Sequence, residues 1–266
     1  MQEIPRLGLG TYENDDPDQC ADSVSTALDA GYRHVDTAQS YGNEAAVGDG
    51  LADSDVPRED VFVATKLATG NLAYDDAVET ARESAERLGV DTIDLLYVHW
   101  PIDSYDPEGT IDALNDLHAD GVVDAVGLSN FRVDQLDAAL ERLDPLLAAH
   151  QVECHPMLPQ DELRAHAVEH DYALVAYCPI ARNQVADVET IQEIATKHDA
   201  SPAQVSLAWL LSKENVVAIP KATSEAHIRD NWAARELDLE GEDLAAIDGI
   251  DERHRIVDFD AAPWNQ

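Results

Sequence analysis

The 266-residue sequence has little positive charge: 17 lysine and arginine residues stand against 54 aspartate and glutamate residues, for a formal net charge of -37. It contains no basic block that could neutralise a phosphate backbone, so nucleic-acid binding is not expected. The acidic residues are spread over the predicted helices, as is typical of a solvated surface. Such a surface suits high salt, because screening shortens to about 3 Å at 1 M and mutes self-repulsion. We therefore take a halophilic source as a hypothesis.

Cysteines and long apolar runs are also scarce. Cys20, Cys154 and Cys178 are odd in number and lack CxxC spacing, so neither a disulfide framework nor a zinc site is expected. No apolar run approaches the length of about 18 residues that a membrane span needs, and the stretch MQEIPRLGLG contains no apolar segment of signal-peptide length. These absences predict a cytoplasmic protein that binds no membrane.

Short β-rich runs alternate with helical segments along the whole chain. The runs cover residues 7–12, 34–36, 61–67, 94–100, 125–129, 147–153, 174–179 and 216–220. Between them, Ala77, Ala81, Ala85 and Leu88 recur at helical spacing, and Ser201 followed by Pro202 is a typical helix start. Strands apolar enough to be buried on both faces predict a parallel sheet covered by helices.

Eight repeats of strand and helix fit a closed (β/α)8 TIM barrel better than an open sheet. Because no internal linker is visible, we expect residues 1–266 to form a single domain. No GxGxxG motif follows the first strand, so a Rossmann fold is not favoured.

Polar side chains follow the predicted strands where the site of such a barrel is built. They are Thr11, Tyr12, Asp36, Tyr41, Lys66, His99, Trp100, Ser129, Asn130, Gln151, Tyr177 and Lys221. A single one would mean little, since a lone strand-end histidine is more often structural. The set as a whole predicts a functional site.

Four of these residues fit together chemically. A tyrosine has a pKa of about 10, and a neighbouring cation such as Lys66 would lower the pKa of Tyr41 by stabilising its phenolate. A buried lysine needs a counter-charge, which Asp36 can supply, and His99 can orient a carbonyl oxygen. The set predicts carbonyl reduction with Tyr41 as general acid, and it requires a nicotinamide cofactor because side chains supply no hydride.

The stretch GYRHVDTAQSYGNEAAVG, residues 31–48, closely resembles the first signature of the aldo-keto reductases. The motifs TKL, HWP, GLSNF, QVECHP, AYCP and IPKA follow in that family's order, so the resemblance spans essentially the whole chain. It implies an eight-stranded α/β barrel that binds NADPH, less often NADH, in extended form. It also implies a catalytic tetrad of Asp36, Tyr41, Lys66 and His99.

The resemblance further implies the binding residues. Ser129, Asn130 and Gln151 would hold the carboxamide of the nicotinamide, and Tyr177 would stack on its ring. The other expected cofactor contacts are Thr11, Asp36, Lys221, Thr223, His227 and Asn231. The substrate pocket would be formed by Tyr12, Leu67, His99 and Trp100, and no metal is implied.

The sequence departs from the family pattern at the adenosine end, where Ala222 and His227 replace a serine and an arginine that help bind the 2'-phosphate of NADPH. Imidazole lacks the bidentate fork of a guanidinium and is mostly neutral at pH 7. We still expect NADP(H) rather than NAD(H), with NAD(H) left open, since Lys221 and Thr223 remain and Arg229 lies nearby in sequence.

The loop after the seventh strand also departs from the pattern, because Cys178 and Ala181 stand where the family has a serine and a glycine-containing loop. Arg182 follows, either as a phosphate contact or as a surface residue. Closure of this loop over the pyrophosphate could differ here, since glycines make such closure easier.

A metal-dependent hydrolase and a non-enzymatic binding protein are the two alternatives to a reductase. In HQVECH, strand alternation places Glu153 and His155 on one face and His150 on the other, which disfavours a metal-dependent hydrolase. A catalytically weak nicotinamide-binding regulatory barrel remains the alternative, and measuring turnover distinguishes it from an enzyme.

We expect a monomer that reduces small aldehydes, α-dicarbonyls or sugar-derived carbonyls. The C-terminal Trp264 either covers the pocket or anchors the chain end.

Overall fold

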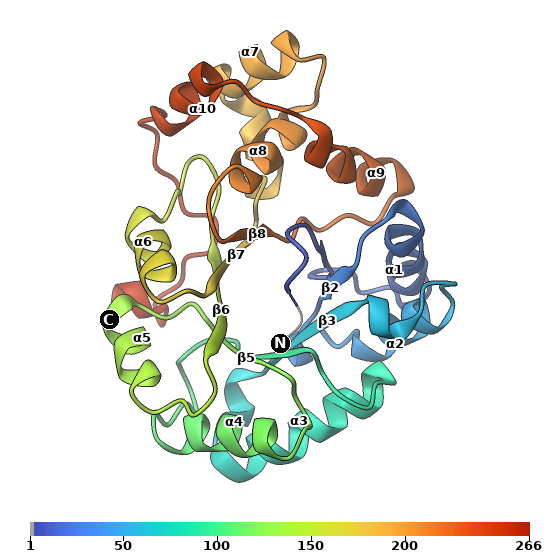
Figure 1. Cartoon of the computed structure of the whole chain (residues 1–266), viewed down its shortest axis with the longest axis vertical. Coiled ribbons are helices and arrows are strands. Elements are labelled where there is room, and N and C mark those ends of the chain that lie inside the picture. Colours follow the sequence, from blue (N-terminus) through green and yellow to red (C-terminus); the bar gives the residue numbers. More distant parts are fainter. Residues whose placement is uncertain (1–2) are drawn as a thin grey trace.

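A computed structural model describes residues 3–266. Eight parallel strands form one sheet in sequential order, and helices surround the ring of strands (Figure 1). Parallel bridges from Leu7 to Ala218 and from Gly10 to Lys221 join the first strand to the last and close the barrel. The predicted (β/α)8 barrel is therefore confirmed. The strands are β1 Leu9–Gly10, β2 His34–Asp36, β3 Phe62–Leu67, β4 Leu95–Val98, β5 Val126–Ser129, β6 Leu147–Glu153, β7 Ala173–Tyr177 and β8 Val216–Ala218.

Helices cover the outside of the barrel as predicted. They are α1 Pro17–Ala30, α2 Glu44–Ala52, α3 Tyr74–Leu88, α4 Gly109–Ala119, α5 Val133–Leu140, α6 Asp161–Glu169, α7 Glu189–Lys197, α8 Pro202–Leu211, α9 Glu225–Ala233 and α10 Gly241–Asp248. Short 3-10 turns are η1 Gln39–Tyr41, η2 Arg58–Asp60, η3 Thr69–Asn71, η4 Ala181–Asp187, η5 Ala234–Glu236 and η6 Pro263–Asn265.

Two helices illustrate why these segments fold as they do. On α3 the apolar residues at helical spacing, including Ala77, Ala81 and Leu88, are buried against the barrel. On α8, Ser201 accepts a hydrogen bond from the N–H of Gln204 in a capping box, and Pro202 occupies the first turn. Both predictions are confirmed.

The strands separate two apolar cores by the alternation of their side chains. Phe62, Ala64, Tyr97 and Val175 belong to the inner core of the barrel. A larger core packs between the strands and the helices. Lys66 follows Phe62 and Ala64 at a spacing of two, so its side chain lies on the inner face.

Several strands are shorter than predicted. The first prediction, residues 7–12, reduces to Leu9–Gly10, and the fourth, residues 94–100, reduces to Leu95–Val98. The residues trimmed from the carboxyl ends of these two strands, which include Thr11 and Tyr12 on the first and His99 and Trp100 on the fourth, line the cavity described below. Across residues 3–266, no helix combines the length and the apolar character that crossing a membrane requires.

Candidate active site

A cavity of about 680 Å³ lies at the carboxyl ends of the strands. Its mostly apolar walls include Ile180, Ile219 and Phe259. The predicted site residues that line it are Thr11, Tyr12, Asp36, Tyr41, His99, Trp100, Asn130, Gln151, Tyr177 and Lys221. Residues from the ends of seven different strands thus converge on one cavity, as expected of this architecture.

An ion pair lies beneath the cavity floor. The Nζ atom of Lys66 is 2.5 Å from Oδ1 of Asp36, and the side chains are 0% and 2% exposed. Lys66 also donates to the carbonyl oxygen of Thr37 at 2.6 Å, and Nε2 of Gln151 donates to Oδ2 of Asp36 at 2.8 Å. Each carboxylate oxygen therefore has a donor, which a buried charge requires. Burial lowers the pKa of Lys66, and Asp36 acts in the opposite direction.

Tyr41 stands between this ion pair and the cavity. Its ring centroid is 5.2 Å from Nζ of Lys66, 5.7 Å from the ring of His99 and 5.2 Å from the ring of Tyr12. Burial raises the pKa of Tyr41 well above its usual value, and the charge of Asp36 raises it further. The net direction is therefore upward, although the sequence predicts a lowering by Lys66, because desolvation of the phenolate is the largest effect on this pKa. Tyr41 therefore keeps its proton at neutral pH.

His99 is a neutral imidazole beside Tyr41. Burial lowers its pKa to about 3, and the charge of Lys66 acts in the same direction. Its Nδ1 atom is 3.2 Å from the hydroxyl of Ser40. With Nδ1 engaged, Nε2 is the ring nitrogen that can bond to a ligand.

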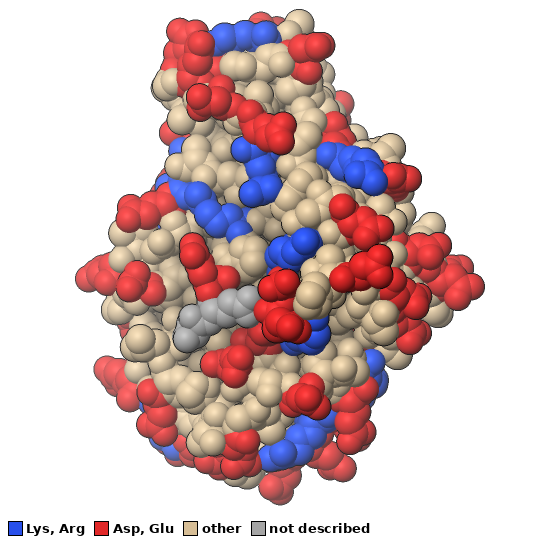
Figure 2. Space-filling view, turned by 45° about the vertical axis from the view of Figure 1, so that its right-hand side comes forward, with Lys and Arg blue, Asp and Glu red and all other residues tan. Residues whose placement is uncertain are grey.

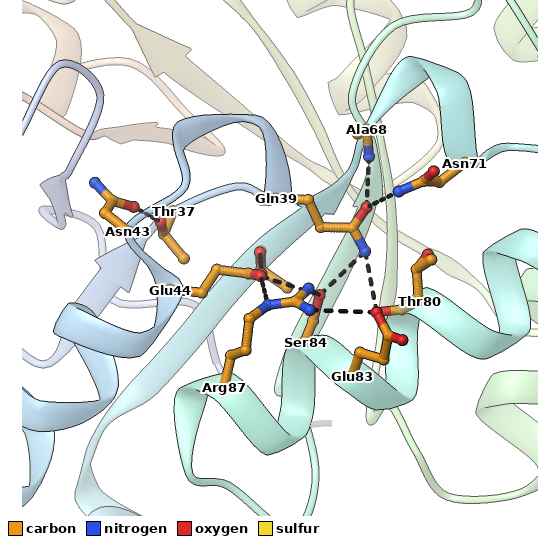
Figure 3. Close-up of polar contacts among 11 residues, drawn as sticks. Thr37, Gln39, Asn43, Glu44, Ala68, Asn71, Thr80, Glu83, Ser84 and Arg87 are labelled. Carbon is orange, nitrogen blue, oxygen red and sulfur yellow. Dashed lines mark hydrogen bonds and ion pairs between the residues drawn. The ribbon is translucent and has the colours of Figure 1, made fainter. Parts of the chain in front are cut away.

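A buried polar network fixes the turn η1 that carries Tyr41 (Figure 3). The amide oxygen of Gln39 accepts from the N–H of Ala68 at 2.8 Å and from Asn71 at 3.0 Å. Its amide nitrogen donates to the carbonyl of Thr80 and to the hydroxyl of Ser84, both at 3.1 Å. The amide thus uses its full bonding capacity to tie η1 to α3 and to the chain after β3.

Glu44 extends the same network at the start of α2 (Figure 3). This carboxylate, 2% exposed, accepts from Nε of Arg87 at 2.8 Å and from the hydroxyl of Thr65 at 2.5 Å. Both ends of the segment from Gln39 to Glu44 are therefore anchored, and Tyr41 lies between them. Sequence reasoning placed Tyr41 at the site but did not identify Gln39 or Arg87 as its supports.

Amide side chains gather on the opposite side of the cavity. Nδ2 of Asn130 donates to the carbonyl of His99 at 3.0 Å and to Oγ of Ser129 at 2.9 Å, and the hydroxyl of Tyr177 donates to Oδ1 of Asn130 at 3.0 Å. Asn130 adopts a left-handed backbone with φ 64°. The ring of Tyr177 lines the cavity together with the amides of Asn130 and Gln151. This combination fits a flat heteroaromatic ligand that carries a carboxamide.

The residues predicted for the adenosine end are less closely grouped. Lys221 is exposed and lines the cavity, whereas Thr223, His227 and Asn231 lie along the chain from β8 into α9 and do not. His227 is exposed, and Asn231 is buried. The guanidinium of Arg229 is paired with Glu225 at 2.8 Å.

The loop after β7 lies across the cavity without the glycines of the family pattern. Cys178, Ala181, Arg182 and Asn183 have positive φ values of 47°, 48°, 50° and 70°. The guanidinium of Arg182 lies 5.7 Å from the ring centroid of Tyr12 and 3.8 Å from a carboxylate oxygen of Glu13. Arg182 therefore lines the cavity mouth as well as facing solvent.

Leu67 does not lie where the resemblance implied. It is fully buried in the core between the strands and the helices, and it does not line the cavity. The reason is strand alternation, because Lys66 faces the interior of the barrel and its neighbour must face outward.

The HQVECH residues do not form a metal site in this structure. His150 accepts a hydrogen bond from the N–H of Phe131, while Glu153 binds backbone N–H groups of the C-terminal segment. A different group places possible ligand atoms within 4.8 Å of one another, outside the cavity: Asp137 on α5, His166 on α6 and His170 directly after α6. There His166 bonds to Asp137 at 3.0 Å and to the hydroxyl of Tyr172 at 2.6 Å, which links the two helices.

The model of the Aldo/keto reductase family matches residues 6–252. The chain belongs to this family. It is 38% identical over 262 residues to an aldo-keto reductase of Mycobacterium avium, covering 96% of this chain and 89% of the relative. It is 37% identical over 257 residues to the methylglyoxal reductase DkgB of Escherichia coli O157:H7, covering 96% of each. The Bombyx mori aldo-keto reductase, solved in complex with NADP, has a TM-score of 0.89 and 32% identity, covering 97% of this chain and 92% of that one.

Family membership establishes the reaction class. The protein is an NAD(P)H-dependent oxidoreductase that reduces aldehydes or ketones. The sequence analysis considered the C-terminal end through Trp264 but did not identify Val257 and Phe259, which line the reductase's cavity. The ring centroids of Trp264 and Trp100 are 5.5 Å apart, which fits the alternative that Trp264 anchors the end of the chain.

Proposed function

We propose that the reductase converts small aldehydes, α-dicarbonyls or sugar-derived carbonyls to alcohols with Tyr41 as the general acid. The observation that carries this proposal is the position of the Tyr41 phenol between His99 and the buried Lys66–Asp36 pair at the cavity floor. Nε2 of His99 orients the carbonyl oxygen, and Tyr41 donates its proton to that oxygen. Lys66 then stabilises the phenolate that remains, and its own charge is balanced by Asp36.

A bound nicotinamide supplies the hydride that completes the reduction. The amides of Asn130 and Gln151, together with the hydroxyl of Ser129, are suited to its carboxamide, and the ring of Tyr177 to stacking. Thr11 and Asp36 lie beside the same part of the cavity. These assignments rest on the grouping of the side chains in one cavity and on the family membership.

We infer a preference for NADP(H) over NAD(H). It is supported by Lys221, an exposed cation beside the cavity, with Thr223, His227 and Asn231 following toward α9. The ratio of kcat/KM for NADPH over NADH tests it: we expect a value above one, and a value below one contradicts it.

We propose small aldehydes, α-dicarbonyls or sugar-derived carbonyls as substrates because the walls beside Tyr41 are aromatic and apolar. Tyr12, Trp100 and Phe259 form them, and the related DkgB is named a methylglyoxal reductase. A screen of methylglyoxal, short aldehydes and sugar-derived carbonyls at high salt, with both cofactors, tests this. Cofactor binding without reduction of any of them would instead favour the binding barrel.

We further propose a single-domain, monomeric, cytoplasmic protein adapted to high salt. Acidic side chains are distributed over the face shown in Figure 2, with few lysine and arginine residues among them. All three cysteines are free thiols, which fits a reducing compartment. Light scattering in concentrated KCl is expected to give the mass of one chain, 29.0 kDa.

A further inference from the structure

Glu153, the last residue of β6, is a fully buried carboxylate that forms no ion pair with a lysine or arginine among residues 3–266. Its side chain is 0% exposed. Oε1 accepts from the backbone N–H of Ile256 at 2.6 Å and from Nε2 of His155 at 2.9 Å, and Oε2 accepts from the N–H of Val257 at 2.7 Å. Nδ1 of His155 has no hydrogen-bond partner, so Nε2, the nitrogen that faces Glu153, makes the ring's only hydrogen bond.

The C-terminal segment supplies two of these three donors, and it also forms one wall of the cavity. Val257 and Phe259 line the cavity, and the ring of Phe259 packs 5.0 Å from that of Trp100. From 251 to 262 the segment has no helix or strand that would hold it in place. One backbone hydrogen bond reaches the segment, from the N–H of His254 to the carbonyl of Met157 at 3.0 Å. Beyond it, the position of this wall depends on side-chain contacts.

The other anchors of the segment lie nearer the surface. Arg255 stacks on Trp264 at 3.9 Å, Trp264 donates to Asp258 at 2.9 Å, and Arg132 donates to the carbonyl of Pro263 at 2.8 Å. These contacts organise the end of the chain. The hydrogen bonds to Glu153 reach a fully buried side chain, and they hold Ile256 together with Val257, which is itself part of the cavity wall.

The two carboxylate oxygens receive the N–H groups of two successive residues, which fixes both the position and the direction of the backbone. Burial by itself raises the pKa of Glu153, but the three hydrogen bonds outweigh it and leave the pKa lowered. The group is therefore charged at neutral pH. A glutamine would offer one acceptor oxygen and turn its NH₂ group toward a backbone N–H.

We propose that Glu153 is a positioning residue that fixes residues 255–259 as a wall of the substrate pocket and thereby sets how tightly bulky carbonyl compounds bind. The part concerning substrate binding rests on the proposed function. A compound as small as methylglyoxal can react at Tyr41 with few contacts to Phe259. An aromatic aldehyde extends to this wall and depends on its position.

The direct test is native-state trypsin cleavage of full-length Glu153→Gln after Arg255, followed by mass spectrometry of the fragment 256–266. We expect cleavage to be at least about tenfold faster than in the parent, since a hydrogen bond to a charged group is worth a tenfold change or more. Glu44→Gln is the matched control: this carboxylate is also buried, but it bonds to Arg87 and Thr65 and not to the C-terminal segment. Unchanged cleavage in Glu153→Gln, or equal acceleration in both variants, overturns the proposal.

Kinetics provide a second readout. In Glu153→Gln, KM for a substituted benzaldehyde is expected to rise about tenfold, while KM for methylglyoxal and the affinity for the nicotinamide cofactor stay within twofold. In Phe259→Ala the wall is already removed, so adding Glu153→Gln is expected to change the benzaldehyde KM little further. Additive effects, or equal effects on both substrates, contradict the proposal.

Amide hydrogen exchange of the parent protein needs no variant. The N–H groups of Ile256 and Val257 are expected to exchange more slowly than that of Asp258, and rapid exchange at both overturns the anchor. Proteolysis and exchange measure the segment itself, so they remain decisive if the parent reduces none of the carbonyl compounds. That outcome would refute the proposed substrate class and not the anchor.

Discussion

Replacing Lys66 with methionine tests the buried ion pair, because methionine fills a similar volume without a charge. Nζ of Lys66 is one of two donors to Asp36 and also donates to the carbonyl of Thr37. Removing one partner of a buried pair costs about 3–5 kcal/mol, since the other charge is left uncompensated. We expect a loss of free energy of unfolding of about 3 kcal/mol, the lower end of this range, because Gln151 still donates to Asp36. Reductase activity should be lost as well.

Urea unfolding in a fixed high-salt buffer measures this loss, and the double variant Lys66→Met/Asp36→Asn is the control. Neutralising Asp36 removes the uncompensated charge, so the double variant should regain most of the stability while remaining inactive. The reasoning is refuted if Lys66→Met is as stable as the parent protein. It is equally refuted if Asp36→Asn lowers stability further in the Lys66→Met background.

Three other predictions follow from the structure. Gln39→Leu leaves the N–H of Ala68 and the side-chain amide of Asn71 without their acceptor, so kcat should fall about 10- to 100-fold through displacement of Tyr41. An unchanged kcat would show that η1 is held by other contacts. Burial lowers the pKa of His150 to about 3. Between about pH 6.5 and 3, the unfolded chain therefore binds one more proton at His150 than the folded protein does, and the free energy of unfolding falls as the pH falls. His150→Gln should reduce the slope of unfolding free energy against pH by about 1.4 kcal/mol per unit near pH 5, and an identical slope contradicts the burial of a neutral ring. Lowering KCl from 1 M should reduce stability through self-repulsion of the acidic surface, and urea midpoints independent of salt would refute the halophilic proposal.

The sequence predicted the barrel because its physics is local and repetitive. Buried strands begin with apolar runs, such as residues 61–64 before Thr65 and Lys66. Helices such as α3 show their buried face in the spacing of Ala77, Ala81 and Leu88. Strand ends were predicted less well. The ladder ends at Val98, while His99 and Trp100 already belong to the cavity.

The site was predictable where one strand end supplies one side chain, as at Asp36, Lys66 and Tyr177. It was not predictable where the outcome depends on competing energies or on distant contacts. The pKa of Tyr41 follows from burial more than from Lys66, which only the packed structure reveals. Leu67 was misplaced because the resemblance was followed at a position where strand alternation points outward.

The sequence drew attention to the C-terminal segment only through Trp264, and it did not identify the two residues of this segment that line the cavity. Val257 and Phe259 lie in an acidic stretch without periodicity, so no local pattern marks them as cavity residues. Their position depends on Glu153, about 100 residues earlier in the chain, and a single sequence does not reveal such a pairing.

The central claim is that Tyr41 is the proton donor, and Tyr41→Phe tests it most directly. This change removes one hydroxyl and leaves the ring between Lys66 and His99. The kcat for reduction of methylglyoxal is expected to fall about 10²- to 10⁴-fold, while the dissociation constant of NADPH, measured by fluorescence titration, stays within twofold. Activity close to that of the parent protein, with the cofactor bound as tightly, would contradict the account.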